Sequence, residues 1–243
     1  MREWQTSDKF YVVPVLRISE LFASLQGEGA TQGAPATFLR LGDCNLSCRY
    51  CDTRYSWDWQ SYVRKDELQD EDFVVTATRV RALAPRRLVV TGGEPLLQQP
   101  ALEALVAELK ELTVEVETNG TIAPSPALCD RVAQWNVSPK LSNSGMAEAQ
   151  RLRPEVLSVL RDTERAWLKL LVVDAGDLAE INQLVTASNW PKDKVILQGG
   201  RFHRRGTGSV TDSGPARVIA TQFCQLILVG FPWRSICTVR ELG

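Results

Sequence analysis

Short apolar stretches typical of β-strands alternate along most of the chain with longer segments whose apolar residues recur at helical spacing. Helices are expected over Asp70–Leu83, Pro100–Leu112 and Leu178–Ala187. The expected strands are Ala36–Leu41, Leu88–Val90, Val114–Val116, Gln134–Val137, Trp167–Val173 and Val195–Leu197. Strands that alternate with helices form βαβ units around a parallel sheet, and ligands bind at the carboxyl ends of such strands. The sequence therefore predicts an α/β fold with functional residues just after the strands.

Composition and charge exclude several classes of protein. At 243 residues, the chain is long enough for one domain or for one domain with an appendage. Its 28 basic and 29 acidic residues argue against a protein that coats nucleic acid. No apolar run approaches the ~18 residues of a transmembrane helix, and the N-terminus lacks the apolar run of a signal peptide. We expect a cytoplasmic protein with reduced thiols and with neither a membrane nor a nucleic-acid partner.

Three cysteines, Cys44, Cys48 and Cys51, form a CxxxCxxC cluster directly after an expected strand. Three thiolates can bind three irons of a [4Fe-4S] cluster and leave the fourth iron open to a small molecule. A structural zinc site would need a fourth ligand, and the only histidine, His203, is distant in the sequence. A chance grouping of reduced thiols is the remaining alternative. The isolated cysteines are interpreted as small packing residues; they are Cys129, Cys224 and Cys237.

A second motif, Thr91-Gly92-Gly93-Glu94-Pro95, follows the expected strand Leu88–Val90. Glycine adopts φ > 0 easily and lets a ligand approach the backbone closely. Alone, the motif is also compatible with an ordinary strand-to-helix turn. Combined with the cysteine cluster, it resembles the GGEP motif of the radical S-adenosylmethionine (SAM) enzymes. The tyrosine before the last cysteine of the triad, Tyr50, strengthens that resemblance.

This resemblance implies an incomplete (β/α) TIM-like barrel of the radical SAM type, with the cluster near its open end. In that superfamily, the open iron binds the amino and carboxylate groups of SAM. Reduction of the cluster then cleaves SAM to a 5′-deoxyadenosyl radical. The protein's own task is to bind and orient the cofactor and to exclude water.

Closer matches, spread over residues 16–198, resemble the 7-carboxy-7-deazaguanine synthase family. They are the stretch Ile18–Gly29, the sequence Cys51-Asp52-Thr53 and the sequence Ser138-Pro139-Lys140. That family converts 6-carboxy-5,6,7,8-tetrahydropterin to 7-carboxy-7-deazaguanine with loss of ammonia, a carbon–nitrogen lyase reaction on the pathway to queuosine. The resemblance implies SAM contacts at Tyr50, Cys51, Asp52, Gly93, Ser138, Pro139 and Lys140. It implies substrate contacts at Leu25, Gln26, Gly27, Arg40 and Thr91, and a Mg²⁺ ligand at Thr53.

Several of these residues also have ordinary interpretations. The glycine-rich loop would suit a hairpin turn, Arg40 an exposed strand edge and Thr53 a turn. An arginine fork nevertheless matches a carboxylate well. A single hydroxyl makes a poor Mg²⁺ site, so the substrate would have to supply further oxygen ligands. Glu117, Asn119 and Lys169 lie in or directly after expected strands and stay unassigned.

The resemblance also implies the course of the reaction. The radical abstracts a hydrogen atom at C6 of the pterin, the ring contracts, and the hydrogen returns, so that SAM acts as a cofactor. Mg²⁺ would act as a Lewis acid and template. No side chain needs to be a nucleophile, so no catalytic residue is assigned. A homodimer and a low-potential electron donor such as flavodoxin are the implied partners.

Two other functions stay open at this point. One is another radical SAM enzyme, such as a glycyl-radical-enzyme activase with a protein substrate. The other is a non-enzymatic metal-binding module, which would cleave no SAM. Metal content and SAM turnover distinguish the three possibilities.

The last segment, Gly199–Gly243, departs from the rest of the chain in composition. It carries six arginines and no lysine against one Asp and one Glu, a net charge of +4, and it has no clear helical period. We expect residues 1–198 to form the radical SAM core and 199–243 to be an atypical segment, either solvated or a basic arm for RNA or an anion. The further helix and strand implied by the resemblance are missing from this segment. A shifted reading frame at the 3′ end of the gene is therefore a further hypothesis, which resequencing would test.

Overall fold

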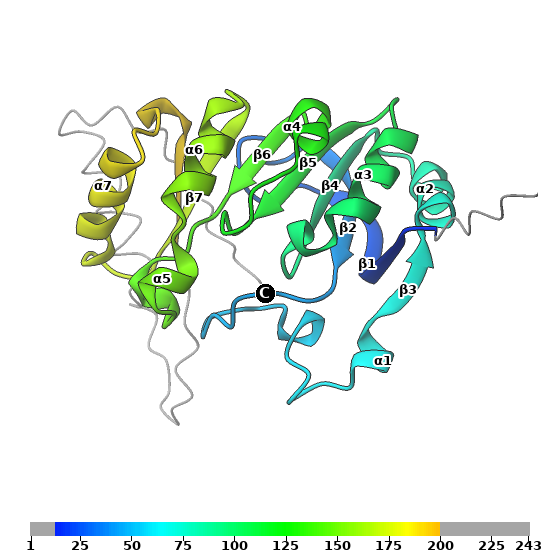
Figure 1. The fold of residues 1–243 in the computed structure, drawn as a ribbon, viewed down its shortest axis with the longest axis horizontal. Helices are drawn as coiled ribbons and strands as arrows, with labels where there is room; N and C mark the ends of the chain where they lie inside the picture. Colours follow the sequence, from blue (N-terminus) through cyan, green and yellow to red (C-terminus); the bar gives the residue numbers. More distant parts are fainter. Residues whose placement is uncertain (1–12, 200–243) are drawn as a thin grey trace, which may run out of the picture.

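The computed structural model describes residues 13–199, and these residues form one sheet of eight strands. The order in the sheet is β3-β1-β2-β4-β5-β6-β7-β8 (Figure 1). The strands are β1 (Val15–Leu25), β2 (Pro35–Leu41), β3 (Gln69–Asp72), β4 (Arg87–Gly92), β5 (Thr113–Thr118), β6 (Gln134–Val137), β7 (Ala166–Val172) and β8 (Val195–Gly199). Neighbours from β2 to β8 are parallel, whereas β1 is antiparallel to both β2 and β3.

This arrangement confirms the expected incomplete barrel. Within residues 13–199, the sheet runs from β3 at one edge to β8 at the other, and these two edges do not pair. The expectations for the segment after Gly199 lie outside the described residues. None of the helices in residues 13–199 is long and apolar enough to cross a bilayer.

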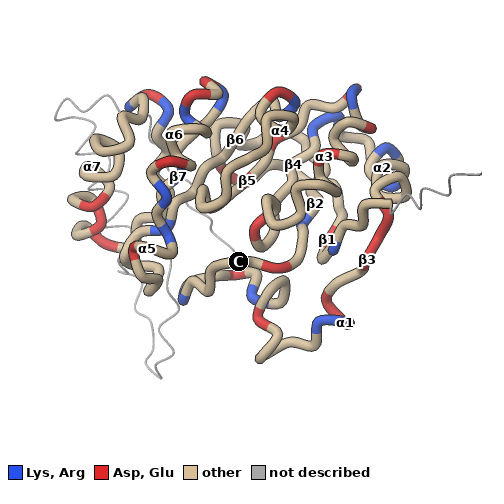
Figure 2. The backbone as a smooth tube through the Cα atoms, viewed as in Figure 1, with Lys and Arg blue, Asp and Glu red and all other residues tan. Residues whose placement is uncertain are grey.

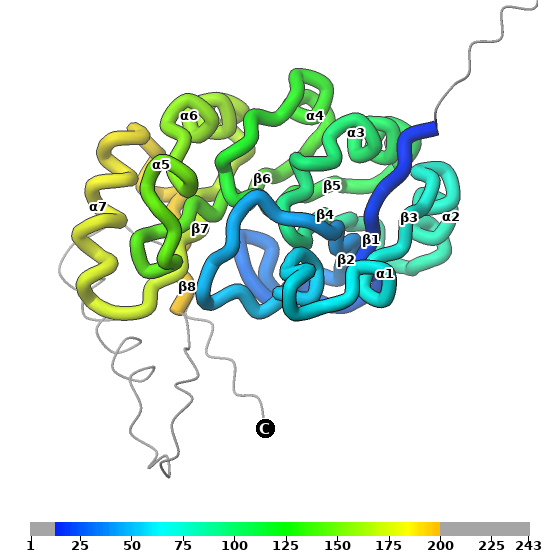
Figure 3. The backbone as a smooth tube through the Cα atoms, turned by 60° about the horizontal axis from the view of Figure 1, so that its bottom comes forward, coloured from blue at the N-terminus to red at the C-terminus, as the bar shows by residue number. Residues whose placement is uncertain are grey.

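Most of the helices pack their apolar residues against one side of the sheet (Figure 3). The helices are α1 (Arg64–Glu67), α2 (Phe73–Ala82), α3 (Gln99–Glu108), α4 (Pro126–Arg131), α5 (Glu148–Arg151), α6 (Pro154–Asp162) and α7 (Asp177–Ala187). Short 3-10 turns are η1 (Arg54–Ser56), η2 (Pro95–Gln98), η3 (Ser142–Ser144) and η4 (Lys192–Lys194). The segment that follows β2, drawn in light blue, lies below the sheet in Figure 1, at the carboxyl ends of the strands.

The two faces of the sheet differ in character because side chains alternate along each strand. The face toward the helices is apolar; its buried residues include Leu88, Val90, Val116, Trp135 and Leu168. The inner face carries a small apolar cluster of Ala36, Phe38 and Val89 together with polar and charged side chains, namely Arg40, Thr91, Glu115, Glu117, Asn136 and Lys169. Buried polar groups need partners. The polar side chains of the inner face are therefore expected to bond one another or a ligand.

Most expected elements are confirmed, but two expected helices have different bounds. The first three residues of the expected helix Asp70–Leu83 belong to β3, an acidic edge strand that is visible in Figure 2. Helix α2 begins after Asp72, whose carboxylate caps it by accepting a hydrogen bond from the Val74 amide at 2.6 Å. The expected helix Pro100–Leu112 ends at Glu108. Leu109 and Leu112 are buried in the core without being helical, so burial rather than helix explains their spacing.

Several observed elements have no counterpart among the expected ones: the strand β3, the four-residue helices α1 and α5, and the longer elements β1, α4 and α6. In β1, the register with β2 shifts between Ile18 and Glu20, and such an irregularity breaks the alternation of apolar and polar residues. Helix α4 is only six residues long and leaves little periodicity to detect. Helix α6 has its buried residues, Val156, Leu157 and Leu160, on one face, a signal that periodicity alone would have revealed.

Candidate active site at the carboxyl ends of the strands

The three cysteines lie on the loop that follows β2. Cys48 is buried, Cys44 and Cys51 are half-buried, and all three are free thiols. The amide of Cys51 donates to the carbonyl of Cys48 at 3.1 Å, which closes a turn between these two cysteines. The indole Nε1 of Trp57 donates to the Sγ of Cys51 at 3.1 Å. The loop therefore holds the triad at the edge where ligands bind in parallel sheets.

Burial controls the acidity of these thiols. It raises the pKa of Cys44 to about 12 and also raises the pKa of Cys48. The ammonium group of Lys140 lies close enough to act on both thiols in the opposite direction. Both thiols are thus protonated in the metal-free protein, and a metal has to displace their protons.

The donor set fits an iron–sulfur cluster better than a single metal ion. Among residues 13–199, no three Cys, His, Asp or Glu side chains converge on a point where one ion could sit. A zinc site requires such convergence, because each Zn–S bond is only about 2.3 Å long. In a [4Fe-4S] cluster each thiolate binds a different iron, so three sulfurs spread along a loop suit it. His203, the histidine considered for zinc, lies outside the described residues.

Two glycines bring the end of β4 against the cysteine loop. A Cβ atom at Gly93 would lie 1.9 Å from the carbonyl oxygen of Asp43, and one at Gly92, whose φ is +134°, would lie 2.1 Å from that of Leu41. The amide of Gly93 donates to Leu41 at 3.0 Å, and the amide of Glu94 donates to Asp43 at 2.8 Å. These glycines permit a close approach of two backbone segments, which seats the cysteine loop on the sheet.

Glu94 of the same motif is completely buried. Its carboxylate accepts hydrogen bonds from the Leu96 amide at 3.0 Å, the Thr118 hydroxyl at 2.9 Å and the Asn119 amide at 2.7 Å. Burial raises the pKa of Glu94 although these donors oppose the shift. The side chain thus caps η2 and fastens it to the end of β5.

Glu117 joins two of the predicted substrate residues on the inner face. One of its carboxylate oxygens accepts from the Thr91 hydroxyl at 2.7 Å, and the other accepts from the Gln26 amide group at 3.2 Å. Both partners are buried, with 8% and 3% of their surface exposed. Gln26 belongs to the loop between β1 and β2, so this contact folds the tip of the hairpin onto the sheet.

A second contact with the hairpin tip is ionic. The ammonium of Lys169 on β7 hydrogen-bonds the carboxylate of Glu28. Burial alone would raise the pKa of Glu28, but the nearby charge and hydrogen bond of Lys169 outweigh it, so the pKa is lowered. Burial alone would lower the pKa of Lys169, but the negative charges of Glu117 and Glu28 outweigh it, so that pKa is raised. Both groups are therefore charged at neutral pH, and Lys169 lies in the field of two carboxylates.

Arg40 lies beside Thr91 in the parallel register of β2 and β4. Its guanidinium Nε donates to Glu20 of β1, and the hydroxyl of Tyr55 donates to the same carboxylate at 3.0 Å. The charge of Asp52 acts on both Arg40 and Lys169. The half-buried Arg40 is thus held on the inner face near other predicted site residues, rather than on an exposed edge.

The predicted SAM residues after β6 are also held at this edge. The Ser138 amide donates to the Thr118 carbonyl at 2.8 Å, and the Lys140 ammonium donates to the Ser138 hydroxyl at 3.0 Å. The guanidinium of Arg151 donates to the Lys140 carbonyl at 2.8 Å and fixes the far side of the turn. Pro139 lies between these two anchored residues, so the turn presents the Lys140 ammonium toward the cysteine loop.

The remaining predicted residues have fewer of the contacts that fix the others, or are more exposed. The hydroxyl of Thr53 lies 3.6 Å from the Sγ of Cys51 and makes no capping hydrogen bond to η1, so it does not serve as a cap. Tyr50 belongs to the cysteine turn, and burial raises its pKa. Asp52 is exposed. Gly27 is half-buried beside Gln26, whereas the Leu25 side chain is 61% exposed and is not gathered with the others.

Four charged or aromatic residues that contact the predicted set, or one another, had no role assigned from the sequence. Lys169 is the one charged residue of β7, and Glu117 is one of two glutamates that alternate with buried valines in β5, which is a signal for the inner face of a barrel mouth. Glu28 lies inside the glycine-rich stretch, but its partner is 141 residues away in the sequence. Trp57 has no sequence signal that would distinguish it from a packing residue.

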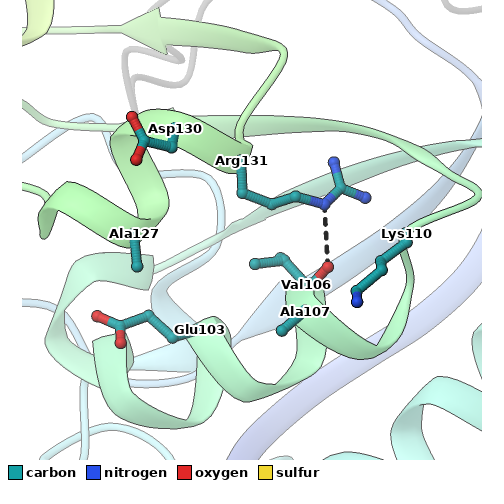
Figure 4. Close-up of a pocket in the computed structure, with 7 residues that line it drawn as sticks. All are labelled: Glu103, Val106, Ala107, Lys110, Ala127, Asp130 and Arg131. Carbon is teal, nitrogen blue, oxygen red and sulfur yellow. Dashed lines mark hydrogen bonds between the residues drawn. The ribbon is translucent and has the colours of Figure 1, made fainter.

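A separate hollow lies between α3 and α4, on the helical side of the sheet (Figure 4). Its lining residues are Glu103, Val106, Ala107, Lys110, Ala127, Asp130 and Arg131. The Arg131 side chain crosses it to donate to the Val106 carbonyl at 3.0 Å. None of the predicted site residues lines this hollow, and we assign it no role.

Comparison with known proteins identifies the family of this chain. Residues 40–139 match the Radical SAM superfamily. The chain is 41% identical over 186 residues to a 7-carboxy-7-deazaguanine synthase from Pyrobaculum aerophilum, which covers 76% of this chain and 79% of that protein. It is 37% identical to the protein of the same name from Hyperthermus butylicus, over 75% of this chain and 76% of that protein.

Solved structures show the same fold at lower identity. The crystal structure of QueE from Escherichia coli aligns with a TM-score of 0.65 and 23% identity, over 93% of this chain and 95% of that chain. Native anSMEcpe with bound AdoMet aligns with a TM-score of 0.56 and 13% identity, over 80% of this chain and 61% of that chain. At these identities the structures support the fold of the sheet and its helices.

Proposed function

The chain belongs to the 7-carboxy-7-deazaguanine synthase family of the radical SAM superfamily, and we propose that it converts 6-carboxy-5,6,7,8-tetrahydropterin to 7-carboxy-7-deazaguanine with loss of ammonia. The reaction makes it a carbon–nitrogen lyase on the pathway to queuosine. One observation carries the proposal: the cysteine loop, the glycine motif and a buried polar inner face meet at the carboxyl ends of the strands. The named relatives favour this reaction over a glycyl-radical-enzyme activase or a metal-binding module.

In this proposal Cys44, Cys48 and Cys51 hold the [4Fe-4S] cluster. When bound, the cluster and SAM supply the radical that abstracts a hydrogen atom from the substrate. The chain's own contribution is to orient SAM through Tyr50, Cys51, Asp52, Gly93, Ser138, Pro139 and Lys140. The ammonium of Lys140 supports this role, because it lies near two of the cysteines and offers donors to a carboxylate.

Arg40 is proposed to bind the substrate carboxylate. Its guanidinium has five N–H donors, and the bond to Glu20 uses only the one on Nε. The two Nη groups can therefore form a bidentate pair with a carboxylate while Glu20 holds the orientation of the fork. Thr91, Gln26 and Gly27 are proposed to contact the pterin ring. Leu25, with its side chain turned to solvent, can contribute to this contact only through its backbone.

Thr53 is proposed to contribute one ligand to Mg²⁺ when the substrate is present. Its hydroxyl lies beside Cys51 and is not engaged in capping, which leaves its lone pairs available to a cation. Because Mg²⁺ needs about six oxygen ligands, the substrate carboxylate and water complete the set. Thr53→Val should raise the Mg²⁺ concentration needed for half-maximal activity, whereas Thr53→Ser should retain the parent value. An equal Mg²⁺ requirement in both variants would contradict this assignment.

Further parts of the proposal concern the surroundings of the site. We propose a homodimer that receives electrons from a low-potential donor such as flavodoxin, in the cytoplasm, where thiols stay reduced. Residues 1–198 are proposed to form the radical SAM core, and 199–243 to be a separate C-terminal segment. Analytical ultracentrifugation and reduction by flavodoxin would test the first two points.

The function is tested by an anaerobic assay on the full chain. The protein is reconstituted with iron and sulfide and given SAM, reductant, Mg²⁺ and 6-carboxy-5,6,7,8-tetrahydropterin. Mass spectrometry should detect 7-carboxy-7-deazaguanine with the parent and none with Cys48→Ala. Release of 5′-deoxyadenosine without product would favour a different radical SAM reaction. If neither compound forms with a fully loaded cluster, the chain is a metal-binding module instead.

A further inference from the structure

The indole of Trp57 hydrogen-bonds one of the cysteine sulfurs. Its Nε1 lies 3.1 Å from the Sγ of Cys51, a shorter contact than the 3.5 Å between the Leu46 amide and the Sγ of Cys44. A neutral thiol is a weak hydrogen-bond acceptor. A thiolate bound to iron carries negative charge and accepts a stronger, charge-assisted bond. The contact is therefore better suited to the cluster-bound cysteine than to a free thiol.

The backbone after the cysteines holds Trp57 in this position. The Ser56 amide donates to the Thr53 carbonyl at 2.9 Å, and the Trp57 amide donates to the Arg54 carbonyl at 3.1 Å. These bonds form the turn η1, which brings the Trp57 indole back to the cysteine loop that precedes it in the chain. The guanidinium of Arg54 also pairs with the buried carboxylate of Asp58 at 2.5 Å, which links the first residue of η1 to the segment that follows Trp57.

A second tryptophan in the same segment also donates a hydrogen bond from its indole, but to a carboxylate. The indole Nε1 of Trp59 donates to the carboxylate of Asp43 at 3.1 Å, next to Cys44 but not to a sulfur. The carbonyl of Ser56 accepts from the Asp43 amide at 2.8 Å, so the segment fastens both ends of the cysteine loop. Of these two indoles, only Trp57 touches a prospective cluster ligand.

A hydrogen bond to a ligand sulfur changes the energy of the cluster's two oxidation states unequally. Reduction adds one electron and makes the cluster and its thiolates more negative. A donor N–H stabilises that added charge, so it raises the reduction potential; hydrogen bonds to the sulfurs are among the main factors that set this potential. The turn fixes the backbone of Trp57, and its side chain is half-buried.

We propose that Trp57 is a positioning residue that raises the reduction potential of the [4Fe-4S] cluster through its N–H···S bond to Cys51. The proposal rests on the proposed function only in requiring that the cysteine triad bind the cluster. The residue acts through Cys51 and need not contact SAM or the substrate. Its consequence is that a donor of given potential reduces the cluster of the parent more completely than that of a variant without the indole N–H.

The test is an anaerobic redox titration of the reconstituted full chain, followed by electron paramagnetic resonance of the reduced cluster. Trp57→Phe removes the donor, and Trp59→Phe removes the neighbouring indole that bonds a carboxylate instead. We expect a more negative midpoint potential for Trp57→Phe and the parent value for Trp59→Phe. At a fixed donor potential, the reduced fraction of Trp57→Phe should fall several-fold. Replacement of Trp57 by benzothienylalanine, which preserves the shape without the N–H, should give the same shift and decides the matter if Trp57→Phe loads its cluster poorly.

Each outcome is distinct. An unchanged potential in a loaded Trp57→Phe or benzothienylalanine variant would overturn the inference, as would equal shifts at Trp57 and Trp59. If the parent itself forms no [4Fe-4S] cluster, the proposed function fails first. A parent that makes product and a Trp57 variant with an unchanged potential would leave the proposed function standing and remove only this inference.

Discussion

The ammonium of Lys169 on β7 hydrogen-bonds the carboxylate of Glu28 at the tip of the hairpin between β1 and β2, although 141 residues separate them. This pair joins the antiparallel part of the sheet to its far parallel part across the inner face. Glu117 adds a second negative charge near the ammonium, and it in turn binds Gln26 and Thr91. Lys169 is thus the cation at the centre of the inner-face network.

Loss of this cation should weaken both fold and site. Lys169→Met removes the ammonium that lies nearest to two carboxylates of the inner face, Glu28 and Glu117. We expect the free energy of unfolding to fall by about 2–3 kcal/mol. This is at or below the lower end of the range for removing one partner of a buried ion pair, because Glu28 is partly exposed. Urea unfolding measures the change, with the exposed Lys192→Met as control. Equal stability of the two variants would show that the pair contributes nothing.

The same pair predicts a pH dependence. The folded-state pKa of Glu28 is lowered, so its contribution to stability is present above its unfolded pKa of about 4.3 and is lost as pH falls through the folded value. The difference in unfolding free energy between the parent and Glu28→Gln should therefore be constant from about pH 6 to 8 and shrink below about pH 4. Urea titrations across this range would measure it. A difference that grows toward acid pH would contradict the assigned direction.

The inner face explains what the sequence could and could not predict. Apolar runs revealed the strands β2 and β4 to β8, because their alternate residues are buried against helices. The cysteine spacing and the glycine motif revealed the cluster loop, because both lie within short local stretches. The pairing of Glu28 with Lys169 was not predictable, since it depends on how the hairpin folds across the sheet. Likewise, only the turn at η1 brings Trp57 back to Cys51.

Arg40 should matter chiefly for substrate binding. Arg40→Lys keeps the charge but loses the planar fork that could bind a carboxylate at two points. The loss of one charged hydrogen bond is worth about 1.5–3 kcal/mol, so we expect KM for the pterin to rise roughly 10- to 100-fold. Steady-state kinetics would measure this, with Arg81→Lys, an exposed helix arginine, as control. A fall in kcat with unchanged KM would place the role of Arg40 elsewhere.

Gly93 should be essential for the position of the cysteine loop. In Gly93→Ala the new Cβ would lie 1.9 Å from a backbone oxygen of Asp43, so the loop has to move away from β4. We expect this variant to retain well under half of the parent's iron and sulfide after reconstitution. Gly199→Ala, where nothing lies within 4 Å, is the matched control. Full cluster content in Gly93→Ala would show that the loop does not depend on this close approach.

The most direct test of the account counts molecules of product against molecules of SAM destroyed. The parent protein, loaded with its cluster, is given limiting SAM and excess 6-carboxy-5,6,7,8-tetrahydropterin, and both 7-carboxy-7-deazaguanine and 5′-deoxyadenosine are measured by mass spectrometry. If this chain performs the ring contraction with SAM as a cofactor, several molecules of product should form for each SAM lost. One SAM consumed for each product, or 5′-deoxyadenosine with no product at all, would contradict it.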